Sequence, residues 1–376
     1  MKIPLAAPDL GPLEQRTVLR VLKTDRLALG SYATRFEKSL ARLTHRRYGV
    51  VTSSGTTALH LAVRLLGLKP GDEVITTPFS FCASANCLLY EGVKPVFVDI
   101  DPVTLCLDPT KVASAITRRT RAILGVDIFG HPADWLRLTA IARRHHLALI
   151  EDACEALGST LRTPQGKKPC GAFGTITTFA FYPNKQITTG EGGMLLTDNY
   201  RLSQLARSLA NQGRNPQNGK WLNHIRLGYN YRLDEMSAAL GWAQLRRLKA
   251  ILQRRRRVAE LYNRLLAPIP EVQTPTVAPG AVVEWFVYCI RLAPSVNREK
   301  ILTRLPAQGI GCAPYFPPIH LLPFYRRRFG YKPGDFPITE EIARRTLALP
   351  FYSKLRAKQV YYIVDCLQKA LKQKEV

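Results

Sequence analysis

Short apolar runs alternate with amphipathic stretches between residues 48 and 200. The apolar runs read YGVVTS, DEVITTP, VKPVFVDID, RAILGVDIFG, LALIEDA, TITTFAF and GGMLLTD. The stretches with apolar residues at helical spacing cover 58–66, 84–90, 109–116 and 134–146. Strands that alternate with helices predict an α/β fold with a mostly parallel sheet, covered by helices on both faces. In such folds, ligands bind at the carboxyl ends of the strands.

The pattern changes after residue 233. One long helical stretch, DEMSAALGWAQLRRLKAILQRRRRVAELYNRLLA, is ended by prolines at 268 and 270. The remaining residues, 271–376, are richer in proline and mix one strand-like run, WFVYCIRLA, with predicted helices at 298–308 and 358–372. We therefore predict a large domain over 1–250 with an N-terminal arm, and a smaller α+β domain over 251–376.

Composition narrows the class of protein. Of 376 residues, 46% are hydrophobic, which is enough for a large core, and no apolar run approaches the roughly 18 residues of a membrane span. The first residues, MKIPLAAPDLGPLEQ, fit no secretory signal, so we expect a cytoplasmic protein that does not enter a membrane. The eight cysteines form no C-x-x-C pair, which predicts reduced thiols and no metal site.

The charge balance raises the question of polyanionic partners. Lys and Arg outnumber Asp and Glu by 54 to 28, a net charge of +26, and such a field attracts polyanions. The basic residues are dispersed, however, and the densest runs, 254–257 and 326–328, lack the aromatic interleaving of nucleic-acid modules. A solvated basic surface is the simpler interpretation. A small anionic substrate such as a nucleotide diphosphate would be attracted by the same field.

The first candidate site is a strand end that leads into a helix. The segment TSSGTTALHLAV, residues 52–63, places hydroxyl side chains and Gly55 at the predicted helix start. A helix N-terminus offers unpaired N–H groups and a partial positive charge, and a glycine lets the backbone approach an anion. The segment could therefore bind a phosphate, although serine and threonine also serve as ordinary N-caps.

Two later segments carry more specific chemistry. In IEDACEA, residues 150–156, an apolar strand delivers Asp152 to its carboxyl end, where a buried carboxylate needs a cationic or hydrogen-bonding partner. The pyridinium nitrogen of pyridoxal phosphate is one such partner, and capping of the next helix is the alternative. In FAFYPNKQITTGEGGMLLTD, residues 179–198, Lys185 lies in a loop before a glycine-rich turn. A Schiff-base lysine needs such a place, but a lone loop lysine is usually solvated.

These segments, taken in order, resemble a known family. The set SSGTTAL, TTPFSF, EDACEA, FYPNKQITTGEGG and GYNYRLDEMSAALG is similar to the nucleotide-sugar aminotransferases of the DegT/StrS type. The resemblance runs from GSYATRFE near residue 30 to YFPPIHLLPFY near residue 320. It implies the fold type I of pyridoxal-phosphate-dependent transferases, with a mostly parallel seven-stranded sheet, and pyridoxal 5'-phosphate as the cofactor.

The resemblance also implies a role for each matching residue. Lys185 would carry the cofactor as an internal aldimine and move the proton, and Asp152 would pair with the pyridine nitrogen. Further cofactor contacts would come from Gly55 and Thr56 to the phosphate, Phe81 to the ring, Glu155 to the ring hydroxyl, and Asn230 to the phosphate in the neighbouring subunit. Substrate contacts would come from Gly30, Tyr315 and His320. The crossing asparagine implies a two-fold homodimer with shared active sites.

Two positions depart from the family pattern. Glu155 stands where members commonly have Gln or His, so it would need a proton or a different partner. Ala180 stands where many members have a phosphate-binding serine, five residues before the lysine. Phosphate binding would then depend more on the helix start and Asn230, or on another hydroxyl such as that of Tyr182.

The expected function is transfer of an amino group, with glutamate as donor, to a keto-deoxysugar attached to a nucleotide. A 4-amino-4,6-dideoxyhexose of the perosamine type is the expected product, although the residues leave C3 or C4 amination open. One alternative is a lyase, because a branch of the family removes a sugar hydroxyl; its members carry His at the lysine position, so Lys185 argues against it. The other alternative is a non-catalytic DNA-binding regulator, which the charge suggests and which Lys185 and Asp152 together oppose.

Overall fold

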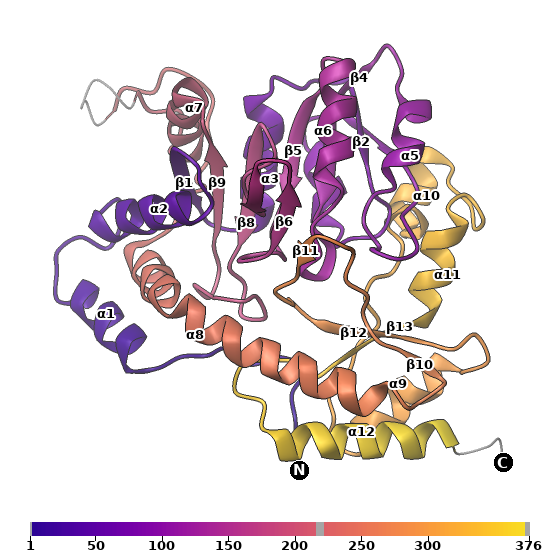
Figure 1. Ribbon diagram of the computed structural model, residues 1–376. Coiled ribbons are helices and arrows are strands. Elements are labelled where there is room, and N and C mark those ends of the chain that lie inside the picture. Colours follow the sequence, from indigo (N-terminus) through magenta and orange to yellow (C-terminus); the bar gives the residue numbers. More distant parts are fainter. Residues whose placement is uncertain (1, 216–221, 373–376) are drawn as a thin grey trace.

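The computed structural model describes residues 2–215 and 222–372, and its centre is a seven-stranded sheet (Figure 1). The strand order is β1–β9–β8–β5–β4–β2–β3, and both pairings of β9 are antiparallel whereas the other pairings in this sheet are parallel. The seven strands are β1 (Tyr48–Thr52), β2 (Glu73–Thr76), β3 (Lys94–Phe97), β4 (Thr120–Val126), β5 (Ala148–Asp152), β8 (Ile176–Ala180) and β9 (Gly193–Thr197). All seven coincide with the predicted apolar runs, which confirms the predicted fold class.

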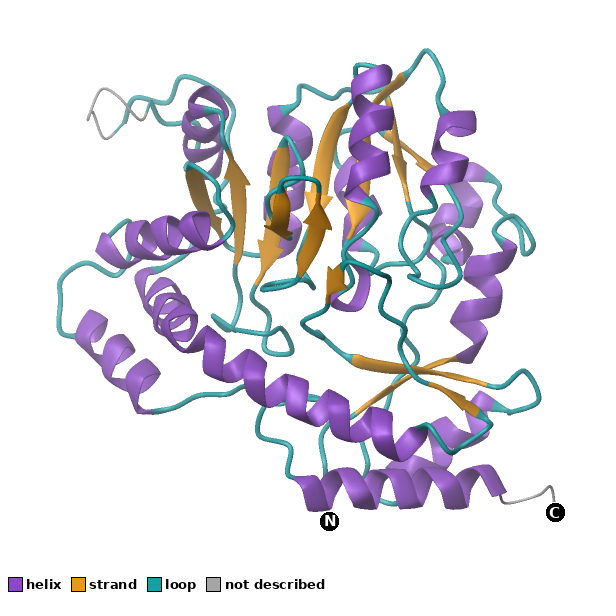
Figure 2. Cartoon of the chain, in the orientation of Figure 1, coloured by secondary structure: helices purple, strands orange, loops and turns teal. Residues whose placement is uncertain are grey.

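Helices cover both faces of this sheet (Figure 2). The covering helices are α3 (Gly55–Leu65), α4 (Ala83–Leu89), α5 (Pro109–Val112), α6 (Trp135–Arg144) and α7 (Tyr200–Ala210). Successive side chains of a strand point to opposite faces. On β4, Ile123 therefore packs in the core that contains Trp135 of α6, whereas Ala122 and Leu124 pack in the core that contains Leu61 of α3.

One long helix, α8 (Glu235–Leu266), connects this body to the C-terminal part. It begins after Asp234, whose side chain accepts a hydrogen bond from the backbone N–H of Ser237 at 2.9 Å. It contacts α1 and α2 with one part of its length and α12 with another (Figure 1). Residue 250, the predicted domain boundary, lies inside this helix. The division into two domains stays a prediction.

The C-terminal part is built on a small sheet, β10–β12–β13. Its elements are β10 (Val272–Gln273), β12 (Tyr288–Leu292), α9 (Arg298–Ala307), η3 (Ile319–Leu321), α10 (Pro323–Phe329), α11 (Pro337–Arg345), β13 (Thr346–Leu349) and α12 (Ala357–Lys372). The predicted strand and the two predicted helices correspond to β12, α9 and α12. A third sheet, β11–β6–β7, consists of β6 (Thr160–Thr163), β7 (Gly166–Pro169) and β11 (Ala281–Val282). None of the described helices is long and apolar enough to cross a bilayer, and all eight cysteines are free thiols.

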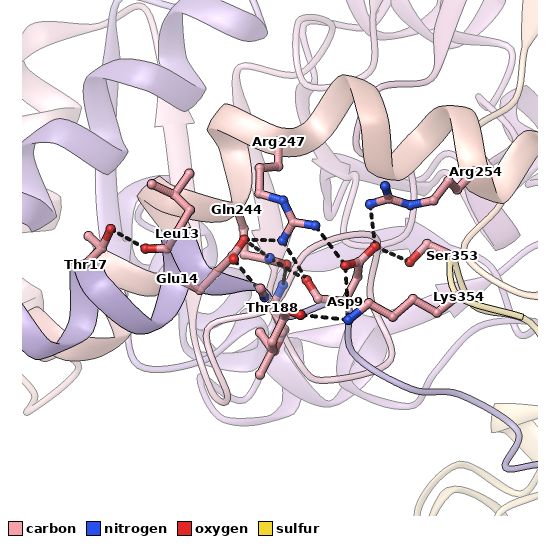
Figure 3. Close-up of polar contacts among 12 residues, drawn as sticks. Asp9, Leu13, Glu14, Thr17, Thr188, Gln244, Arg247, Arg254, Ser353 and Lys354 are labelled. Carbon is pink, nitrogen blue, oxygen red and sulfur yellow. Dashed lines mark hydrogen bonds and ion pairs between the residues drawn. The ribbon is translucent and has the colours of Figure 1, made fainter.

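The N-terminal arm, with α1 (Pro12–Leu22) and α2 (Ser31–Leu43), is fastened by a buried carboxylate, Asp9 (Figure 3). Asp9 accepts hydrogen bonds from Arg247 Nη2 at 2.9 Å, Arg254 Nη2 at 2.6 Å and Ser353 Oγ at 2.6 Å. Glu14 accepts a second hydrogen bond from Arg247, through Nη1 at 2.6 Å, and one from Gln244 Nε2 at 2.7 Å. The cluster thus joins the arm, α8 and the C-terminal part.

Asp9→Asn is expected to lower the free energy of unfolding by about 2 kcal/mol at neutral pH, because charge-assisted hydrogen bonds are lost. Burial alone would raise the pKa of Asp9, but hydrogen bonds from Ser353, Arg247 and Arg254 outweigh it and hold the pKa below its usual value. A lowered pKa in the folded state stabilises the protein above the unfolded-state pKa, about 3.9, and this contribution is lost as the pH falls. Urea unfolding at several pH values measures the effect.

The difference between wild type and Asp9→Asn should therefore shrink below about pH 4. The matched control is Asp365→Asn, which removes a carboxylate that pairs with Lys369 on the surface of α12. This control should unfold like the wild type at every pH. A difference for Asp9→Asn that stays constant down to acidic pH would contradict a stabilising charge at this position.

Candidate active site

A cavity of about 620 Å³ lies at the carboxyl ends of three central strands. Val126, Asp152 and Ala180 end β4, β5 and β8 and line the cavity. Further lining comes from the start of α3, the segment that leads into α4, the residues after β5, the loop after β8, Phe286 and the segment 314–317 of the C-terminal part. The predicted site residues in the lining are Gly55, Thr56, Phe81, Asp152, Glu155, Lys185 and Tyr315.

Lys185 projects into this cavity from the loop between β8 and β9. Its backbone N–H donates to the Tyr182 carbonyl at 2.9 Å, which closes a turn around the residue. Its Nζ lies 3.8 Å from the centroid of the Phe286 ring and 3.4 Å from Glu155 Oε1. The amine is therefore held between an aromatic face and a carboxylate, with only 13% of the side chain exposed.

Asp152 lines the cavity and is 4% exposed. Its Oδ2 accepts a hydrogen bond from Ser84 Oγ at 2.7 Å, and its Oδ1 accepts one from the Cys154 N–H at 3.2 Å. Ser84 Oγ in turn lies 2.9 Å from Ser80 Oγ. No lysine or arginine of the described residues forms an ion pair with Asp152. A carboxylate that is oriented by neutral donors keeps its charge available for a cation that enters the cavity.

Glu155 has two partners in this arrangement. Its Oε1 faces Lys185, and its Oε2 accepts a hydrogen bond from the backbone N–H of Phe129 at 2.9 Å. Burial raises the pKa of Glu155, and the nearby Asp152 raises it further, while Lys185 and the Phe129 N–H lower it by a smaller amount. Glu155 therefore holds a proton more readily than an ordinary glutamate.

The first turn of α3 has both of the properties that its sequence suggests. Ser54 is an ordinary N-cap, because its Oγ accepts from the Thr57 N–H at 3.1 Å while Thr57 Oγ1 accepts from the Ser54 N–H at 3.0 Å. Gly55 and Thr56 line the cavity, and among the described residues no group accepts a hydrogen bond from their backbone N–H groups. The helix start is thus both capped and open to an anion.

Gly55→Ala is expected to weaken cofactor binding about tenfold or more, because a Cβ at this position would lie 2.5 Å from Ala180 Cβ. The helix start would have to move away from β8, and with it the N–H groups that face the cavity. Adding Ala180→Gly to this variant removes the opposing methyl group and should restore most of the affinity. Equilibrium titration with pyridoxal 5'-phosphate measures both variants. Equal binding by wild type and Gly55→Ala would contradict a phosphate site at this helix start.

Three predicted site residues do not line the cavity. Asn230 is exposed in the segment before α8. Gly30 caps the N-terminus of α2 and lines a second cavity of about 400 Å³, together with Arg207 and Arg232. His320 is fully buried, with Nε2 at 3.1 Å from Glu340 Oε1. The roles of these three residues stay predictions.

The roles of other site residues were not predicted from the sequence. Ser84 orients Asp152 across 68 positions of the chain, and Phe286 and the Phe129 backbone come from other distant segments. No local pattern marks them, because an ordinary serine or phenylalanine acquires its role only when the chain folds.

The cavity combines the groups that pyridoxal phosphate requires: an amine at Lys185, a carboxylate at Asp152, an anion site at the start of α3, and an aromatic wall at Phe81, which is 58% exposed. These groups, on this mostly parallel sheet, define a pyridoxal-phosphate-binding transferase. The DegT/DnrJ/EryC1/StrS aminotransferase family matches residues 8–368. The chain belongs to this family, which confirms the resemblance seen in the motifs.

Individual relatives agree with this result. The chain is 38% identical over 375 residues to the GDP-perosamine synthase of Caulobacter vibrioides, with 98% of each chain covered. It resembles the solved structure of DesV from S. venezuelae with a TM-score of 0.89 and 34% identity, over 96% of this chain and 95% of that one. A putative sugar aminotransferase of Streptococcus pneumoniae, solved in its PMP form, gives a TM-score of 0.93 at 25% identity, over 99% and 98%. Aminotransferases of this family use pyridoxal 5'-phosphate, as predicted.

Proposed function

We propose that the protein transfers an amino group from glutamate to a nucleotide-linked keto-deoxysugar and forms a 4-amino-4,6-dideoxyhexose. The observation that carries this proposal is that Lys185 and Asp152 open into one cavity of about 620 Å³, a size typical of small-molecule sites. The similarity to a GDP-perosamine synthase supports the substrate class. The net charge of +26 favours capture of an anionic sugar nucleotide. We propose a cytoplasmic location.

Lys185 would act as the mobile base of both half-reactions. When bound, pyridoxal phosphate supplies a carbonyl group that exchanges amines and a ring that withdraws electrons from the bond being broken. The Lys185 amine lies within the cavity and would take up and return the proton at the reacting carbon. Glu155 Oε1, 3.4 Å from the Lys185 Nζ, can accept a hydrogen bond from the protonated amine.

Asp152 and Phe81 would hold the cofactor ring. The Asp152 carboxylate is fixed by Ser84 and by the Cys154 N–H, so it can keep the ring nitrogen protonated without reorganising during the reaction. Phe81, exposed at the cavity wall, offers a flat face to the ring. Because Ala180 offers no hydroxyl to the phosphate, the N–H groups of Gly55 and Thr56 would supply much of its binding.

We propose that two copies of the chain share their active sites through Asn230. Asn230 is exposed and lies outside its own cavity, as a residue that serves a neighbouring subunit should. The segment that leads to it exposes large apolar side chains, with Leu222 at 76%, Ile225 at 49% and Leu227 at 80%. Exposed apolar groups of this density are typical of surfaces that another protein covers.

The experiment that tests the function supplies the holoenzyme with glutamate and a panel of 3-keto and 4-keto sugar nucleotides, and detects the products by mass spectrometry. We expect one keto-sugar to yield an aminated sugar together with an equal amount of 2-oxoglutarate. A deoxygenated sugar would show a lyase instead. An absence of product with every keto-sugar, combined with a salt-dependent affinity for DNA, would favour a regulator.

A further inference from the structure

The residues on either side of Asn230 are locked into an extended segment. The Tyr229 N–H donates to the Leu209 carbonyl at 2.6 Å, and the Tyr231 N–H donates to the Ala210 carbonyl at 2.9 Å. The Ser53 N–H donates to the Tyr231 carbonyl at 2.8 Å. In an extended segment, successive side chains point to opposite sides. Tyr229 and Tyr231 therefore share one side, and Asn230 leaves on the other.

The two tyrosines are fixed by a polar network beneath them. Their rings stack with centroids 4.7 Å apart and planes 7° apart. The Tyr231 hydroxyl lies 2.9 Å from His60 Nδ1, and the Tyr229 hydroxyl donates to Glu91 Oε1 at 3.2 Å. His60 Nε2 lies 2.7 Å from the same oxygen of Glu91, and Arg64 Nη1 donates to Glu91 Oε2 at 2.8 Å. His60 is 5% exposed, whereas Arg64, Glu91 and the two tyrosines are partly buried.

None of these side chains lines the cavity, and stability alone does not explain the network. Two phenylalanines would bury the same rings without the cost of desolvating hydroxyl and carboxylate groups. Each of these side chains is hydrogen-bonded, although Arg64 Nε has no partner among the described residues, and such a network favours a single arrangement of the segment. His60 also belongs to α3, whose first turn faces the phosphate site of its own subunit. The backbone around Asn230 is therefore held, through Tyr231 and His60, by the same helix α3 whose first turn lines the cavity.

We propose that His60, Glu91 and Tyr231 are positioning residues that hold Asn230 in the orientation in which it binds the cofactor phosphate of the neighbouring subunit. This inference rests on the proposed dimer with shared active sites. A tyrosine that loses its hydroxyl keeps its stacking area but can rotate and shift, and Asn230 moves with it. The affinity for the cofactor should then fall in the neighbouring subunit and not in the subunit that carries the change.

The test uses mixed dimers of two differently tagged copies. One copy carries Lys185→Ala, so only the other copy links the cofactor and shows its visible absorbance; this second copy holds the reporter site. Tyr231→Phe is placed either on the Lys185→Ala copy or on the reporter copy. In the proposed dimer, the Asn230 that reaches the reporter site belongs to the Lys185→Ala copy. The dissociation constant for pyridoxal 5'-phosphate is measured in each mixed dimer. We expect an increase of about fivefold, the effect of one hydrogen bond, only when the Lys185→Ala copy carries Tyr231→Phe.

The matched control is Tyr262→Phe, which removes a buried hydroxyl that donates to the Pro350 carbonyl at 2.9 Å in the C-terminal part. It should leave the reporter affinity unchanged in either copy. An effect of Tyr231→Phe that appears only within the reporter copy, or in neither arrangement, would overturn the positioning role. Asn230→Ala on the Lys185→Ala copy separates the two proposals. If it has no effect, the shared site itself fails; if it weakens binding and Tyr231→Phe does not, only the positioning role fails.

Discussion

Lys185→Ala is expected to abolish transamination and, together with it, the visible absorbance of the bound cofactor. In the proposed function, the amine of Lys185 is the covalent attachment point and the base of both half-reactions, and no other lysine or arginine of the described residues lines the cavity. The variant should still fold, because the side chain contributes only one long contact to Glu155 and one to the Phe286 ring. Absorbance spectra of the purified protein and turnover with glutamate measure the two losses.

The control for this change is Lys167→Ala. Lys167 is an exposed lysine on β7, outside the cavity lining, so its removal changes the net charge by the same amount without touching the site. It should keep both absorbance and turnover. Unimpaired turnover by Lys185→Ala would refute the assignment of this lysine, and an aldimine absorbance band retained by the Lys185→Ala protein would show that the cofactor is attached to another amine.

Asp152→Asn is expected to lower the rate of the chemical step about a thousandfold. An ion pair at about 4 Å contributes about 4 kcal/mol at an effective dielectric constant of 20, and each 1.36 kcal/mol changes a rate about tenfold. Asparagine has nearly the same shape, so it can keep the contact with Ser84 while it loses the charge that, in the proposed function, holds the ring nitrogen protonated. Single-turnover decay of the cofactor absorbance on addition of glutamate measures this rate directly.

Asp134→Asn is the matched control, because Asp134 is a helix N-cap that accepts from the Arg137 N–H at 3.1 Å and lies outside the cavity lining. Asparagine caps helices about as well as aspartate, so this variant should react like the wild type. A rate for Asp152→Asn within tenfold of the wild type would show that the ring does not depend on this carboxylate.

The central sheet could be predicted because its strands are buried on both faces and read as continuous apolar runs. In β5, Leu149 and Ile150 are both buried, and the sequence LALI shows this directly. The strands β6 and β7 could not be predicted, since their side chains are mostly half-buried or exposed and show no apolar alternation. The strand β13 follows α11 without any turn residue, and the helices α10 and α11, which begin at Pro323 and Pro337, were not among the predicted elements.

The site could be predicted where a local motif places a group at the end of a strand. Asp152 ends β5 and Lys185 follows β8, so both were expected at the edge of the sheet where the cavity lies. The proline-rich segment shows the limit of such motifs. Tyr315 reaches the cavity, whereas His320 in the same segment is buried beside Glu340, because the direction of each side chain depends on the packing of η3 against the rest of the fold.

The long helix α8 belongs to two apolar cores at once. Leu248, Ile251 and Leu252 pack in the core that contains Phe36, while farther along the helix Tyr262 packs in the core that contains Leu347. If either core unfolded alone, the apolar side chains of α8 that pack in it would be exposed to water. Heating should therefore unfold both regions in one cooperative transition. A chain that was cut within α8 would give two fragments, and each would lack part of the helix that packs against the other fragment.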